Sequence, residues 1–242
     1  MLSFDSVRRF VKKLGEEVED LDVALLNAGI APPKYVVNES TGWEEALQVN
    51  ILSTALLAIL LMPKLKATAA KTGRVAQLTF TGSLGHTFLT SKDLPISEEE
   101  SLLRKINSPE FFNAQRSYIV IKLLTMYVMR GLIDDFSTNE KGELDVAVNV
   151  VCPGYCVTDL GRDHPWYIVL PTKIMQLYCG RSAEEGSRSL VSATLLGEMG
   201  HGKFWTNDVF VKPGVLVVSE EGKKLQSKAW KEIMDICRKE IP

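Results

Sequence analysis

One pair of side chains could perform acid–base chemistry if residues 115–136 form a helix. Tyr118 and Lys122 are four residues apart in this largely apolar stretch. Four residues make about one helical turn, so both side chains would lie on one face, roughly 6 Å apart along the axis. A phenol titrates near about pH 10, and a neighbouring ammonium favours the phenolate. We therefore expect Lys122 to lower the pKa of Tyr118 and to make the phenol a proton donor and acceptor.

The same spacing also has a purely structural interpretation. A tyrosine at the edge of the core, followed one turn later by a solvated lysine, is ordinary on an amphipathic helix. A short motif is a hypothesis until its structural context supports it. The order of the surrounding elements must therefore decide between the two interpretations.

Apolar runs and turn residues predict strands that alternate with helices. Buried strands are expected at residues 21–26, 74–81, 145–152 and 203–205. Helices are expected at residues 3–18, 43–65, 115–136, 182–196 and 222–239. Ser182 and Glu185 form a capping-box pattern at the start of one of them. This alternation predicts an α/β fold with a doubly wound parallel sheet that helices cover on both faces.

Three short motifs stand where predicted strands end. In parallel sheets of this kind, ligands bind beyond the carboxyl ends of the strands. These ends carry Asn27, Ala28 and Gly29, then Gly82 and Ser83, then Pro153 and Gly154. Their shared position favours a functional site there, although each motif is also ordinary turn sequence.

Composition excludes several classes of function. The chain has 242 residues, 45% of them apolar, and a net charge of −2, with no basic cluster that would indicate nucleic-acid binding. Its four cysteines have no metal-ligand spacing, so we expect no metal site and reduced thiols in a cytoplasmic protein. The longest apolar run, at residues 51–62, is too short to span a bilayer and predicts a buried helix.

Taken in order, the motifs resemble the short-chain dehydrogenase/reductase family, whose members have a single Rossmann-type domain. The resemblance covers residues 1 to about 215. It rests on Asn27-Ala28-Gly29, Asn50, Ser83, Tyr118-x-x-x-Lys122, and Pro153-Gly154 followed by Thr158. The sequences at residues 83–86 and 203–205 are most similar to retinol-dehydrogenase-like and fungal secondary-metabolism members.

The resemblance implies an NAD(P)-dependent oxidoreductase that interconverts a carbonyl and an alcohol on a small organic substrate. Tyr118 would exchange a proton with the substrate oxygen, and Ser83 would hold that oxygen. Lys122 would tune the phenol and bind the nicotinamide ribose, while Asn50 would anchor a water that links Lys122 to solvent. These four residues are the implied catalytic set.

The resemblance also implies a cofactor, NADP or NAD, and a set of residues around it. Association as a homodimer through the helices that carry Asn50 and Tyr118 is a further expectation. The cofactor-binding residues would be Asn27, Ala28, Gly29, Tyr118, Lys122, Pro153, Gly154, Val157 and Thr158.

The sequence departs from the family pattern in two places. No Gly-rich strand-to-helix turn occurs in the 242 residues, which predicts a single, partial domain over residues 1–242 whose first strands are missing. Val23 and Leu25 would then face solvent at an open sheet edge. The family's usual gap between Ser83 and Tyr118 is lengthened by an inserted loop at about residues 87–113. A truncated, non-catalytic binding or scaffold protein, or an inactive one, is the alternative hypothesis.

Residues 155–180 include a cluster of aromatic residues, Trp166, Tyr167 and Tyr178. The family places a substrate-covering segment at this point of the chain. The cluster could therefore form a lid over a substrate or belong to the core, and the sequence leaves both possibilities open.

Overall fold

A mixed five-stranded sheet forms the centre of the fold. The computed structural model describes residues 1–97 and 99–241; Glu98 of the predicted inserted loop and Pro242 at the end of the predicted domain lie outside them. The strand order is β1-β2-β3-β4-β5; β1 to β4 are parallel, and β5 is antiparallel to β4. The strands are β1 (Val23–Leu26), β2 (Ala76–Thr81), β3 (Val146–Cys152), β4 (Phe204–Thr206) and β5 (Val209–Val211). The predicted Rossmann-like sheet is confirmed, and antiparallel β5 is an addition.

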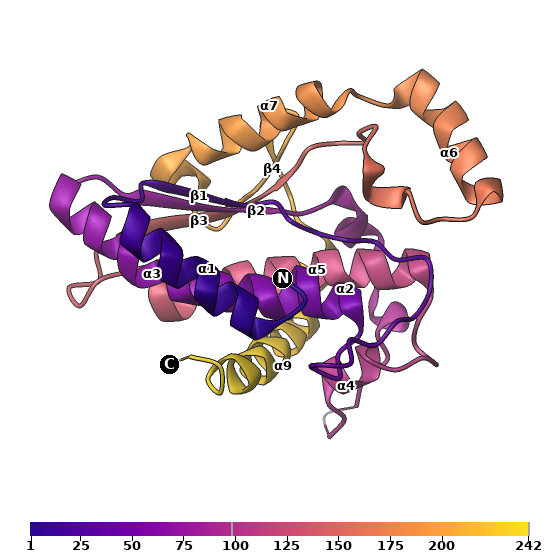
Figure 1. Cartoon of the computed structure of the whole chain (residues 1–242), viewed down its shortest axis with the longest axis horizontal. Coiled ribbons are helices and arrows are strands. Elements are labelled where there is room, and N and C mark those ends of the chain that lie inside the picture. Colours follow the sequence, from indigo (N-terminus) through magenta and orange to yellow (C-terminus); the bar gives the residue numbers. More distant parts are fainter. Residues whose placement is uncertain (98, 242) are drawn as a thin grey trace.

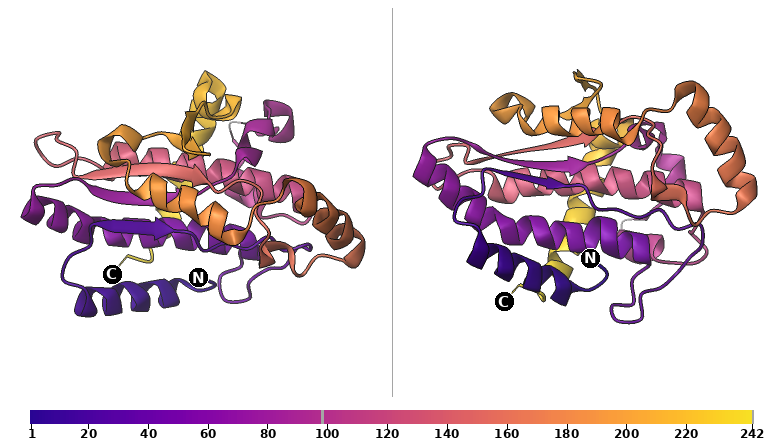
Figure 2. Two further views of the ribbon diagram at one scale, coloured as in Figure 1. Left: turned by 90° about the horizontal axis from the view of Figure 1, so that it is seen from above. Right: turned by 45° about the horizontal axis from the view of Figure 1, so that its top comes forward.

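Helices cover both faces of the sheet (Figure 1). On one face lie α1, α3 and α5, and on the other lies α7, which begins with the predicted capping box of Ser182 and Glu185. Helix α9 packs against α5 on the side away from the sheet (Figure 2). The helices are α1 (Phe4–Glu17), α2 (Glu45–Leu47), α3 (Ser53–Thr72), α4 (Leu102–Ile106), α5 (Ala114–Phe136), α6 (Trp166–Cys179), α7 (Ala183–Thr194), α8 (Val215–Val218) and α9 (Glu220–Cys237).

The strands differ in burial according to their place in the sheet. All seven residues of β3 are buried, as expected for a central parallel strand with helices on both faces. In the described chain β1 lies at one edge, and Val23 and Leu25 are 42% and 36% exposed. The exposure expected for these two side chains is therefore observed.

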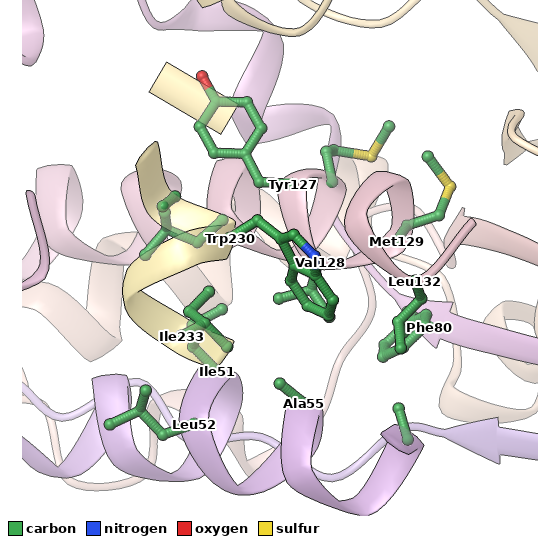
Figure 3. Packing of buried hydrophobic residues seen from close by; sticks show 14 of the residues in the cluster. Ile51, Leu52, Ala55, Phe80, Tyr127, Val128, Met129, Leu132, Trp230 and Ile233 are labelled. Atoms are coloured by element: carbon green, nitrogen blue, oxygen red, sulfur yellow. The ribbon is translucent and has the colours of Figure 1, made fainter. Parts of the chain in front are cut away.

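Close packing of α9 against α5 closes the core. In Figure 3, Trp230 and Ile233 of α9 lie between α5 and the helix that carries Ile51 and Leu52. A Cβ atom on Gly131 of α5 would lie 2.1 Å from Cδ2 of Trp230, so the indole fits there because residue 131 is glycine. The indole Nε1 of Trp230 donates to Asp135 at 2.7 Å, which fixes the orientation of the ring.

The long apolar helix is longer than predicted. It is continuous from Glu45 to Thr72, because α2 passes through one π-helical turn, η1 (Gln48–Leu52), into α3. By length and composition this helix could cross a membrane, but 89% of its most apolar window is buried inside the protein. It is the core helix of this fold, in agreement with the sequence-based expectation.

Helices also form in two segments outside the helices expected from the sequence. The predicted loop at residues 87–113 includes α4, whose Leu102, Leu103 and Ile106 are buried. The carboxylate of Glu232 on α9 accepts hydrogen bonds from the backbone N–H groups of Leu102 and Leu103, which ties α4 to the core. The other segment forms α6, in which no residue is buried, so the core interpretation of its aromatic residues is wrong.

Candidate active site

Tyr118 and Ser83 meet at the carboxyl end of β2. Tyr118 lies in the second turn of α5, and Ser83 caps the short 3-10 helix η2 (Leu84–Phe88) that follows β2. The Ser83 side chain lies close enough to the Tyr118 hydroxyl to lower the pKa of the phenol as a hydrogen-bond partner would. Gly82 allows this geometry, because a Cβ atom there would lie 2.4 Å from Cγ1 of Val150 on the neighbouring strand. A strand, a turn and a helix thus place two hydroxyl groups at one point.

The environment of Tyr118 differs from the sequence-based expectation. Burial of the side chain raises the pKa of Tyr118, and the nearby Cys152 raises it further; the hydrogen bond with Ser83 acts in the opposite direction. Burial has this effect because a low-dielectric environment disfavours the phenolate. The net pKa of Tyr118 is therefore raised rather than lowered as expected, because burial has the largest effect on it.

Lys122 does lie beside Tyr118, but its amine has another partner. Its Nζ atom is 5.6 Å from the centroid of the Tyr118 ring and donates to the backbone carbonyl of Thr81 at 2.9 Å. Only 9% of Lys122 is exposed, and this burial lowers the pKa of its amine to about 8. An amine that titrates near neutrality can exchange protons under the same conditions as a catalytic acid or base.

Ser83 is held in place by its own turn. Its Oγ atom accepts a hydrogen bond from the N–H of Gly85 at 3.1 Å, which leaves the hydroxyl proton free to be donated. The ring of His86, which is fully buried, lies with Nδ1 2.6 Å from the Ser83 carbonyl and packs edge-on against Phe204. Burial lowers the pKa of His86. The buried imidazole of His86 therefore supports the turn that carries Ser83.

The two asparagines stabilise the backbone near the site. Asn50, in the π-helical turn, accepts from the N–H of Ile30 at 2.9 Å and donates to its carbonyl at 2.8 Å. Its amide thus fixes the loop after β1. Asn27 accepts a hydrogen bond from the Thr81 hydroxyl at 2.9 Å. Ala28 and Gly29, which follow Asn27, border a hollow beside α1.

The residues after β3 occupy the same edge of the sheet. Gly154 has a positive φ of 85°, and Arg181 packs beside it. Thr158 caps a short 3-10 turn, and Val157 is 48% exposed. Pro153 accepts a hydrogen bond from the thiol of Cys156. The structure places these residues beyond β3, but it records no contact of theirs with Tyr118.

Cys152 is a site residue that the motif analysis missed. It is the last residue of β3, is 4% exposed, and lies close enough to Tyr118 and Lys122 to raise the pKa of both. The sequence feature that could have identified Cys152 is its position at a strand end, immediately before Pro153-Gly154. Thr81, the partner of both Asn27 and Lys122, was missed for a similar reason, because it belongs to a strand rather than to a turn.

The donor set fits one half of a dinucleotide. A buried ammonium and a phenol face the carboxyl ends of β2 and β3, where a ribose hydroxyl and a carbonyl substrate could accept hydrogen bonds. The Gly-rich turn that holds a pyrophosphate at a helix N-terminus does not occur in the 242 residues. The described residues therefore fit the nicotinamide–ribose half of the cofactor.

Sequence comparisons place the chain among short-chain dehydrogenases. A family model described as short chain dehydrogenase matches residues 1–86. The chain is 42% identical over 242 residues to the short-chain dehydrogenase/reductase ffsI of Aspergillus flavipes, covering 100% of this chain and 69% of that protein. It is 39% identical over 240 residues to phmF of Phaeosphaeria nodorum, covering 99% of this chain and 69% of that protein.

Solved structures show the same fold at lower identity. A complex of Pseudomonas aeruginosa RhlG with NADP aligns with a TM-score of 0.53 at 20% identity, covering 86% of this chain and 72% of that one. A protein from Mycobacterium paratuberculosis aligns with a TM-score of 0.58 at 18% identity, covering 98% of this chain and 73% of that one. At these identities the likeness concerns the fold.

Proposed function

Because the chain belongs to the short-chain dehydrogenase/reductase family of oxidoreductases, we propose that it interconverts a carbonyl and an alcohol on a small organic substrate. NADP is the proposed cofactor, with NAD as the second choice. Proteins of similar structure that were solved in complex with NADP, NAD or 5-hydroxy-NADP support this choice. The observation that carries the proposal is the grouping of three side chains: Ser83 lies close enough to Tyr118 to lower its pKa, and the Lys122 amine is 5.6 Å from the Tyr118 ring.

In the reducing direction, Tyr118 donates its phenolic proton to the substrate oxygen. When bound, the nicotinamide supplies the hydride that reaches the carbonyl carbon. Ser83 donates its hydroxyl proton in a hydrogen bond to the same oxygen, which stabilises the negative charge that develops there. The product is an alcohol, and the remaining phenolate is reprotonated from the solvent side. Oxidation of an alcohol runs through the same groups in reverse.

Lys122 has two proposed tasks in this scheme. Its ammonium stabilises the phenolate that Tyr118 becomes after proton donation, since opposite charges in a buried site attract strongly. Its amine also donates to the nicotinamide ribose. Asn27, Ala28, Gly29, Pro153, Gly154, Val157 and Thr158 are proposed to border the rest of the cofactor, and Asn50 is proposed to hold the loop that supports it.

The exposed apolar side chains of α6 favour a substrate that is itself apolar. Trp166, Leu177 and Tyr178 are 76%, 86% and 87% exposed, at the edge of the sheet where the strands end. We propose that α6 covers a substrate with a large apolar portion, of the kind found in fungal secondary metabolism. Burial of these side chains against the substrate would favour binding by the hydrophobic effect.

The test is the turnover of Tyr118→Phe. NADPH oxidation is followed with a panel of aromatic and aliphatic ketones and aldehydes, using the protein with the wild-type sequence as reference. Loss of the proton donor is expected to lower kcat by about 10²-fold or more. A variant that retained full turnover would rule out this mechanism. The alternative of a non-catalytic scaffold is not favoured by relatives named as dehydrogenases, and undetectable NADPH binding would revive it.

A further inference from the structure

A side-chain hydrogen bond joins the ends of β1 and β2. Backbone pairing between these strands ends at Leu26 and Phe80. One residue further along each strand, the Thr81 hydroxyl donates to the Asn27 side-chain oxygen at 2.9 Å. The two strands thus stay connected at the point where the chain turns into the site. β1 is an edge strand in the described chain, so its end has no second strand to hold it.

The carbonyl of the same threonine binds the amine of Lys122. The peptide between Thr81 and Gly82 is held from the other side, because the Gly82 N–H donates to the Val151 carbonyl of β3 at 2.7 Å. In a planar trans peptide the C=O and N–H groups point in opposite directions. The Thr81 carbonyl therefore points away from β3, and Lys122 donates to it at 2.9 Å.

We propose that Thr81 is a positioning residue for Lys122, acting through a chain of hydrogen bonds that runs from Asn27 through Thr81 to the lysine amine. Asn27 holds the hydroxyl, β3 holds the peptide N–H, and the carbonyl fixed between them holds the amine near the Tyr118 ring. The catalytic role of these hydrogen bonds rests on the proposed function, whereas their geometry does not depend on it.

The position of the amine matters because Lys122 is buried and donates a hydrogen bond to the Thr81 carbonyl. The titratable groups that face it are Tyr118 on its own helix and Cys152 on β3. A buried ammonium needs hydrogen-bond acceptors, since burial alone favours the neutral amine. The Thr81 carbonyl supplies one acceptor in a fixed place, and it thereby favours the charged form.

The simpler interpretation is that the Asn27–Thr81 bond only links two strand ends. In that case its loss would change the melting temperature and leave Lys122 unaffected. If Thr81 positions the lysine, loss of the Asn27–Thr81 bond must change the titration midpoint of Lys122 even where the melting temperature is unchanged. These two outcomes separate positioning from simple support.

The test is the titration of Lys122 by NMR in the full 242-residue chain labelled with ¹³C and ¹⁵N at lysine, the signal being assigned with Lys122→Met. The wild-type amine is expected to titrate near pH 8. Thr81→Val keeps the β-branched shape and the carbonyl but removes the hydroxyl, so the midpoint is expected to fall by half a unit or more. Asn27→Ala, at an exposed position, is expected to reproduce that fall, and Thr81→Ser to restore the wild-type midpoint.

Thr206→Val is the matched control. Thr206 is also the last residue of a strand, β4, and its buried hydroxyl finds no partner among residues 1–97 and 99–241. This variant should leave the Lys122 midpoint unchanged. An unchanged or raised midpoint in both Thr81→Val and Asn27→Ala would overturn the proposal. Because no substrate is needed, the result is independent of the Tyr118→Phe assay, which tests the function itself.

Discussion

Two regions at the same edge of the sheet differ in how they are held. Around Tyr118, the groups are buried, and Lys122 is hydrogen-bonded to the end of β2. In α6, by contrast, the large apolar side chains point to solvent, and the half-buried residues are Val169, Thr172 and Gln176. The first region is complete without a ligand, whereas the second exposes the surface that a helix normally buries.

The difference indicates that the two regions have separate functions, proton transfer near Tyr118 and substrate covering by α6. Groups that handle protons need fixed distances, so a site built on a strand end and a helix is the appropriate support. A segment that covers substrates needs a surface that is covered only when the substrate is present. Changes near Tyr118 should therefore affect kcat, and changes in α6 should affect KM.

The largest expected effect is that of Ser83→Ala on turnover. The variant removes one hydrogen-bond donor to the substrate oxygen, and loss of such a donor typically lowers kcat by about 10²–10³-fold. The measurement is NADPH oxidation at saturating substrate. A control is Ser192→Ala on α7, far along the chain from the site, which should keep wild-type kcat. A kcat within a factor of two of wild type in Ser83→Ala would exclude an oxyanion-stabilising role.

The next effect concerns Lys122 and the pH dependence of stability. Its pKa is about 8 in the folded protein and 10.5 ordinarily. Between these values the unfolded state binds more protons, so the free energy of unfolding rises with pH. The wild type should therefore gain up to about 3 kcal/mol relative to Lys122→Met between pH 8 and pH 10.5. Urea unfolding of both proteins at pH 7.5 and pH 10.5 measures this difference, and parallel pH profiles would show that Lys122 is solvated.

Gly82→Ala should destabilise the protein by about 1–3 kcal/mol, because the added methyl group overpacks the contact with Val150. Turnover should fall as well, since Ser83 follows directly. Gly15→Ala is the control: Gly15 lies within α1, nothing lies within 4 Å of its added Cβ atom, and alanine favours the helix. Denaturant unfolding should show opposite signs for the two variants. Equal stability of Gly82→Ala and the wild type would contradict this prediction, because it would mean that the end of β2 can move away from Val150 without a cost in free energy.

The smallest effect on stability is expected in α6. Leu177→Ser should change the free energy of unfolding by less than about 0.5 kcal/mol, because the side chain is 86% exposed. It should raise KM for apolar ketones while kcat stays near the wild-type value. A fall in kcat with unchanged KM would contradict the proposed covering role.

The elements that carry the site were predictable from the sequence because their signals are local. Strands β2 and β3 are apolar runs that end in turn residues, and α5 carries Tyr118 and Lys122 on one face. The order of motifs along the chain was thus sufficient for the architecture.

The electrostatics of the site were not predictable in the same way. The pKa of Tyr118 depends on burial and on Cys152, which is 34 residues away in sequence. The hydrogen-bond partner of Lys122 is a backbone carbonyl, and every residue type has one, so the sequence cannot indicate which carbonyl it is. Helix α6 was not among the expected helices, because its large apolar residues lie at exposed positions, which contradicts the usual pattern.

The most direct measurement for the central claim is a double-mutant cycle of Ser83→Ala and Tyr118→Phe. If both hydroxyl groups act on one substrate oxygen as a unit, the double variant should turn over about as slowly as Tyr118→Phe alone. If the losses in kcat multiply instead, the two groups act independently. That result would contradict the account of a shared proton-handling site.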